Sequence, residues 1–73
     1  MELNAVSLLM DLEDDAFNGR DARMIAPDGG EALKLYVDGD VMSYLRQTPG
    51  YDEYLRRDDA LDWIDRRIPE QYR

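Results

Sequence analysis

The chain has 73 residues, 17 of them acidic and 9 basic, so its formal net charge is −8, and it contains no histidine. A chain of this length forms one domain, here 1–73, around one small core. The charge predicts an acidic surface that repels nucleic acid and anionic lipid and attracts basic protein surfaces.

Cysteine is absent as well as histidine, which removes disulfides, thiolate nucleophiles, the commonest metal ligand and the usual general base near neutral pH. No stretch has the spacing of a calcium-binding loop, and a carboxylate enzyme needs a deeper cleft than so short a chain supplies. We therefore expect no enzyme activity, no cofactor and no bound metal. The chain has no apolar run long enough to cross a bilayer and no positive leader at residues 1–4, so we expect a cytoplasmic protein without membrane contact.

The first predicted element is an amphipathic helix over residues 5–17. Asn4 is a suitable N-cap, and Gly19 suits the left-handed position that ends a helix. Apolar residues recur between them at helical spacing, namely Leu8, Leu9, Leu12 and Ala16.

Residues 22–37 predict a β-hairpin. Leu33, Leu35 and Val37 alternate with Lys34 and Tyr36, so the two sets face opposite sides of a strand. The intervening sequence 27–30 combines proline, aspartate and two glycines, which is typical of a tight turn.

Residues 41–47 are expected to form a short helix that Asp40 caps and Pro49 follows. The remaining chain is expected to be helical up to Pro69, in one piece or two, with a bend favoured at Arg57–Asp58. The expected fold class is α+β: an N-terminal helix, a β-hairpin, a short helix and a bent C-terminal helix. The predicted core joins the hairpin to the first and last helices through Leu8, Leu9, Leu12, Leu33, Leu35, Val37, Leu61, Ile64 and Ile68.

The first helix carries four acidic residues before the first basic residue of the chain, namely Asp11, Glu13, Asp14 and Asp15. Like charges three and four residues apart repel on a helix, and a helix C-terminus favours cations. The acids of the C-terminal segment differ, because Asp52, Glu53 and Asp62 each precede an arginine by four residues. We interpret the four first-helix acids as a partner-binding surface; the alternative is a solvated face that keeps the protein soluble.

Two aromatic residues complete the candidate partner-binding set. Trp63 lies to one side of the apolar stripe of the last helix, so it is either a core-edge residue that covers the hairpin or an exposed interface anchor. Tyr36 points away from Leu33 and Leu35, so it lies either on a solvent face or under a helix.

The chain resembles the small acidic phage-encoded inhibitors of bacterial defence, the anti-CRISPR and anti-restriction proteins, in its length, its lack of catalytic side chains and its acids. The acids in question are Asp11, Glu13, Asp14 and Asp15 together with Asp58, Asp59, Asp62 and Asp65. Many of these inhibitors mimic DNA in charge and occupy a basic groove on their target. The resemblance implies a non-catalytic inhibitor of a nucleic-acid-binding complex. The arginines interleaved at 56, 57, 66 and 67 favour a local acidic plug over mimicry of a whole duplex.

An alternative function is an antitoxin-like or adaptor module that binds one cognate protein mainly through apolar contacts. In both cases the expected partner is a protein, with no direct contact to nucleic acid. The chain itself is expected to be a monomer or a homodimer, because a core this small is marginal alone.

Overall fold

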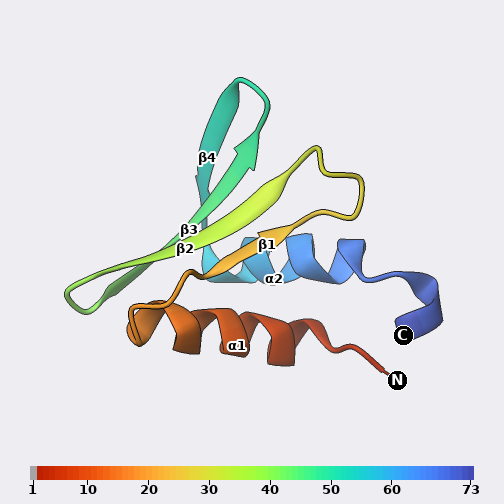
Figure 1. The fold of residues 1–73 in the computed structure, drawn as a ribbon, viewed down its shortest axis with the longest axis horizontal. Helices are drawn as coiled ribbons and strands as arrows, with labels where there is room; N and C mark the ends of the chain where they lie inside the picture. The colour runs from red at the N-terminus through yellow and green to blue at the C-terminus, as the bar shows by residue number, and fades with distance from the viewer. Residues whose placement is uncertain (1) are drawn as a thin grey trace.

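The computed structural model describes residues 2–73 and has an α+β fold, which confirms the predicted class (Figure 1). A helix comes first, four strands follow, and a second helix and a short 3-10 turn close the chain. The elements are α1 (Ala5–Phe17), β1 (Arg23–Ile25), β2 (Ala32–Asp38), β3 (Val41–Thr48), β4 (Tyr51–Leu55), α2 (Arg57–Arg67) and η1 (Glu70–Tyr72).

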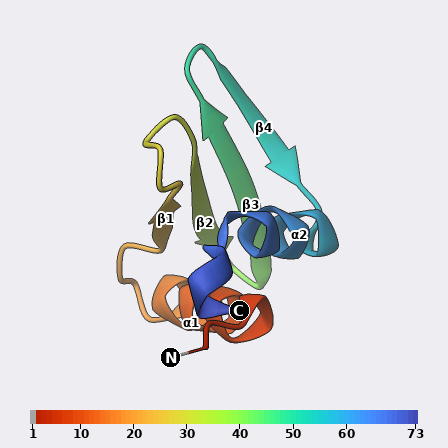
Figure 2. The same ribbon diagram turned by 90° about the vertical axis from the view of Figure 1, so that its right-hand side faces the viewer.

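The four strands form one antiparallel sheet in the order β1-β2-β3-β4. Both helices lie against the same face of this sheet, and the tip of the β3–β4 hairpin extends away from them (Figure 2). The helices run antiparallel, so the two ends of the chain meet, and Leu3 N–H donates to Tyr72 C=O at 2.6 Å. The molecule therefore has two layers, and only one face of the sheet is covered.

The helix α1 begins and ends at the predicted residues because both of its ends are capped. Asn4 Oδ1 accepts hydrogen bonds from Val6 N–H at 2.8 Å and Ser7 N–H at 3.2 Å, which satisfies two of the free amides of the first turn. Gly19 adopts φ +73° directly after the C-cap Asn18. This is the left-handed conformation that favours glycine.

The predicted hairpin over residues 22–37 is confirmed as the β1–β2 pair. Met24 pairs with Leu33, and Ile25 pairs with Ala32. In the connecting turn, Asp28 Oδ1 accepts from Gly30 N–H at 2.9 Å. The predicted alternation also holds, because Leu33 and Leu35 are buried against the helices while Tyr36 is exposed on the other face.

Two predicted helical segments are strands instead. Residues 41–47 belong to β3, and residues 51–55 form β4. Gly39 at φ +63° and Gly50 at φ +79° lie in tight turns that fold the chain back on itself, so β3 pairs with β2 from Asp38↔Val41 onward and β4 pairs with β3 from Thr48↔Tyr51 onward. The expected bend at Arg57–Asp58 is the boundary between β4 and α2, and α2 ends before Pro69 as predicted.

The core lies between the sheet and the helices, and Leu9, Leu33 and Ile64 are its largest fully buried members. Five of the predicted core residues are buried: Leu9, Leu33, Leu35, Ile64 and Ile68. Leu8, Leu12 and Leu61 are partly buried against this cluster, and the half-buried Val37 lies outside it. Two aromatic residues, Tyr44 and Trp63, also belong to the buried cluster.

Candidate functional site

Among the four acids of α1, Glu13 forms hydrogen bonds with side chains of two other elements. Its carboxylate accepts from Arg57 Nε at 2.8 Å, from Arg57 Nη2 at 3.0 Å and from the hydroxyl of Tyr44 at 2.6 Å. The Arg57 hydrogen bonds lower the pKa of the Glu13 carboxyl against the opposing effect of burial. Burial, together with the bond to Glu13, raises the pKa of Tyr44 to about 12.

Asp14 and Asp15 are paired with Arg20, which lies just beyond the end of α1. The Arg20–Asp15 distance is 2.8 Å, and the Arg20–Asp14 distance is 3.2 Å. Among residues 2–73, Asp11 alone of the four acids forms no ion pair. Three of the four acids are therefore paired with arginine, because the turn at Gly19 returns Arg20 to the end of α1 and tertiary folding brings Arg57 to Glu13.

The acids near the C-terminus pair with other arginines than the i,i+4 rule predicted. Asp52 and Glu53 lie in β4, where residues four apart are not helical neighbours, so their expected pairs with Arg56 and Arg57 do not form. Of the three predicted pairs, the described residues form Asp62–Arg66 alone, at 2.9 Å. Glu53 pairs instead with Arg46 of the neighbouring strand, at 3.1 Å. Within the described chain, Asp58 and Asp59 have no ion-pair partner; they lie in the first turn of α2, where the helix dipole favours acids.

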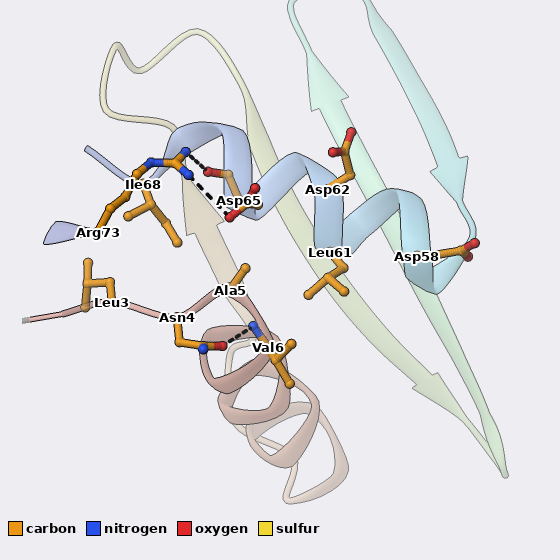
Figure 3. Close-up of a pocket in the computed structure, with 10 residues that line it drawn as sticks. All are labelled: Leu3, Asn4, Ala5, Val6, Asp58, Leu61, Asp62, Asp65, Ile68 and Arg73. Atoms are coloured by element: carbon orange, nitrogen blue, oxygen red, sulfur yellow. Dashed lines mark hydrogen bonds and ion pairs between the residues drawn. The ribbon is translucent and has the colours of Figure 1, made fainter. Parts of the chain in front are cut away.

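A groove of about 540 Å³ lies between the first turn of α1 and the length of α2 (Figure 3). Apolar side chains from both ends of the chain and from α2 form its floor: Leu3, Ala5, Leu61 and Ile68. On the α1 side stands Val6, which is 47% exposed. Three acids of α2 border the groove, Asp58, Asp62 and Asp65, and Arg73 closes one end through a 3.6 Å contact with the Asp65 carboxylate. The groove therefore combines apolar surface with negative charge.

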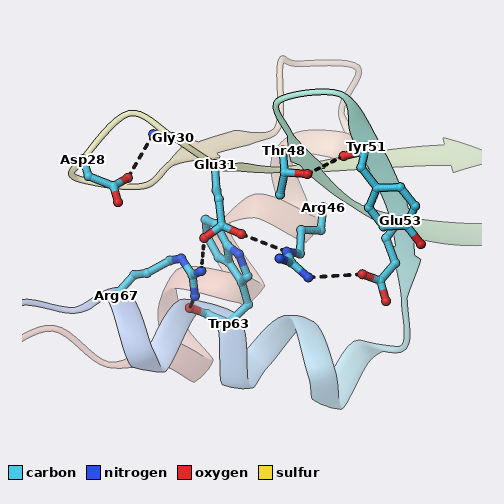
Figure 4. Close-up of polar contacts among 9 residues, drawn as sticks. All are labelled: Asp28, Gly30, Glu31, Arg46, Thr48, Tyr51, Glu53, Trp63 and Arg67. Carbon is cyan, nitrogen blue, oxygen red and sulfur yellow. Dashed lines mark hydrogen bonds and ion pairs between the residues drawn. The ribbon is translucent and has the colours of Figure 1, made fainter.

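Trp63 is 5% exposed and lies between α2 and the sheet, as the core-edge interpretation expected (Figure 4). The Arg67 guanidinium stacks 4.2 Å from the centre of its ring. Arg67 also forms an ion pair with Glu31, and Glu31 accepts from Arg46 Nε at 2.9 Å. These two arginines lower the pKa of the Glu31 carboxyl, Arg67 more strongly. Such a buried ring offers little surface to a partner.

Tyr36 is 40% exposed on the sheet face that no helix covers, with Lys34 Nζ 5.0 Å from its ring centre. It lies across the sheet from the acids of α1. The structure therefore does not bring the six predicted partner-binding residues into one surface, and none of the six borders the groove. Sequence reasoning missed the groove because its lining combines residues 3–6 with residues of α2 and the C-terminal end, which only the packing of α1 against α2 brings together.

The described residues contain no group of three or more side chains that could hold a metal ion together. They also contain no helix that is both long enough and apolar enough to cross a membrane. Comparisons with models of protein families, with curated proteins and with solved structures found no match.

Proposed function

We propose that this is a non-catalytic binding protein that occupies a basic surface of a partner protein, and that it inhibits a nucleic-acid-binding complex as the small phage-encoded anti-defence proteins do. The groove between α1 and α2 is the observation that supports this proposal best. Its apolar floor can bury a partner's side chains, while Asp58, Asp62 and Asp65 attract cations to its border. The net charge of −8 adds long-range attraction to any basic surface.

A phage-plating assay tests the inhibitory function directly. The chain is expressed in bacterial strains that each carry one defined CRISPR or restriction system, and the plating of a targeted phage is counted. We expect plating to rise in at least one strain and to return to the restricted level with the Asp58→Asn, Asp62→Asn, Asp65→Asn triple variant. Unchanged plating across a panel that covers the known system types contradicts the inhibitory function.

The adaptor function remains a second candidate because α1 also exposes apolar side chains, including Met10 and Phe17. Binding of an octalysine peptide separates the two candidates. An electrostatic surface should bind octalysine and lose at least about tenfold in affinity between about 50 and about 300 mM salt. A module that binds through apolar contacts should not bind octalysine at either salt concentration.

A further inference from the structure

We propose that the partner element in the groove is a single basic amphipathic helix that lies along α1 and α2. Its apolar side would contact Val6, Met10 and Leu61, and its lysines or arginines would face Asp58, Asp62 and Asp65. This inference rests on the proposed function and adds to it the secondary structure and the charge pattern of the segment that binds.

The apolar half of this surface is a stripe on α1. Val6, Met10 and Phe17 are 47%, 56% and 59% exposed. Met10 and Phe17 follow Val6 by four and eleven residues, so the three side chains lie on the same side of the helix. Val6 lines the groove, so this side of α1 faces it at Val6. Single exposed apolar residues are ordinary, whereas an aligned set beside a groove is typical of an interaction surface.

The charged half is a stripe on α2. Asp58, Asp62 and Asp65 follow the spacing i, i+4, i+7, so they line one side of the helix over two turns. Asp58 forms no ion pair within the described chain, and the Asp62–Arg66 pair is exposed, with the Arg66 side chain 73% accessible. Exposed pairs of this kind contribute little to stability, so a partner's cation can replace Arg66 at little cost.

The shape of the groove favours a helix over an extended segment. It runs between two antiparallel helices, which offer no strand edge to which an extended peptide could add. The 11 residues of α2 span about 16 Å, which accommodates about three turns of a third helix. Both stripes repeat with helical spacing, so a helical partner meets them with matching side chains.

A second copy of the chain does not complement this surface. Its own α2 would place the same three aspartates opposite Asp58, Asp62 and Asp65, and each copy carries a net charge of −8. Like charges that face each other across an interface oppose association. Charge complementarity therefore selects a cationic partner.

The test uses two peptides of leucine and lysine with identical composition and length, about 16 residues each. In one the leucines follow helical spacing, and in the other they alternate as in a strand. We expect the helical-period peptide to bind at least about tenfold more tightly than the alternating one. Equal affinity overturns the helix inference but leaves the proposed basic-surface binding intact, provided that octalysine still binds. If no cationic peptide binds, both proposals fail.

Matched variants locate the binding surface. Two groove variants are compared with the parent: the double variant Val6→Ser with Met10→Ser, and the triple asparagine variant at 58, 62 and 65. Each should lower the affinity for the helical-period peptide at least about tenfold. One control is Val41→Ser, which removes an exposed valine from the far face. The other is Asp38→Asn with Asp40→Asn and Asp52→Asn, which removes the same charge on the sheet side. Both controls should keep near-parent affinity, and circular dichroism confirms that every variant is folded. An equal loss in the controls and the groove variants overturns the inference.

Discussion

Glu13 joins three elements through its two carboxylate oxygens. It lies on α1, its arginine partner Arg57 begins α2, and its tyrosine partner Tyr44 belongs to β3. Hydrogen bonds to a charged group are roughly twice as strong as neutral ones, and a bidentate arginine pair also fixes orientation. This residue thus holds the helix pair to the sheet, which is a structural role.

The lowered pKa values of Glu13 and Glu31 predict how stability depends on pH. A carboxylate with a lower pKa in the folded state stabilises the fold above its unfolded pKa of about 4.3, and loses that contribution as pH falls through the lower folded value. We expect the urea midpoint to fall between about pH 5 and about pH 3, less steeply in Glu13→Gln. Glu70→Gln, whose side chain is 95% exposed, should follow the parent curve. Identical slopes for Glu13→Gln and the parent would contradict this assignment.

At the scale of elements, the two helices differ in how their charged residues are placed relative to the helix dipole. Helix α2 has acids in its first turn and Arg66 and Arg67 in its last, which is the favourable arrangement. Helix α1 has neither feature and gathers acids at its C-terminal end. Arg20 offsets this from beyond the Gly19 turn, and the Asn18 side-chain amide donates to the carbonyl of Asp14 at 2.7 Å.

Because α1 lacks acids in its first turn, the Asn4 cap is the main local stabiliser of its N-terminus. Asn4→Ala should lower the free energy of unfolding by about 1 kcal/mol, since two backbone amides lose their acceptor. Asn4→Asp should keep most of the stability, because its carboxylate accepts the same bonds and favours the dipole. Urea denaturation followed by circular dichroism measures both. Ser7→Ala, an exposed change in the same turn, is the control; an alanine at position 4 that matches the parent would contradict the capping role.

At the scale of the whole molecule, the net negative charge opposes nucleic-acid binding even though the uncovered face of the sheet carries cations. One row of paired residues crosses the uncovered sheet face from β1 to β4: Arg23, Lys34, Leu45 and Tyr54, with Tyr36 nearby. In other proteins, cations beside aromatic rings bind single-stranded nucleic acid. This chain, however, carries a net charge of −8. We expect no binding of duplex DNA at physiological salt, because few counterions would be released. A gel shift of duplex DNA at micromolar protein would contradict this expectation.

The sequence by itself determined the elements whose signals are local. The Asn4 cap and the Gly19 turn delimit α1, alternation over residues 33–37 identifies β2, and Pro69 marks the end of the last helix. Each of these signals acts between residues a few positions apart, so it can be interpreted without knowing the path of the chain. The assignments of residues 41–47 and 51–55 as helix were wrong, because the apolar residues of these short segments fit both the helical and the strand period. The β-branched and aromatic residues Val41, Tyr44, Thr48, Tyr51 and Tyr54 were the available strand signal.

Only the tertiary structure decided which charges are compensated and where the groove lies. Arg57 reaches Glu13 across 44 positions of sequence, and Arg67 reaches Glu31 across 36. A charge interacts with whatever folding brings within a few ångströms, so spacing along the chain predicts ion pairs only within a helix that actually forms. The same holds for the groove, whose floor combines Leu3 and Ala5 with Leu61 and Ile68. These residues become neighbours only because α1 and α2 pack antiparallel on one face of the sheet.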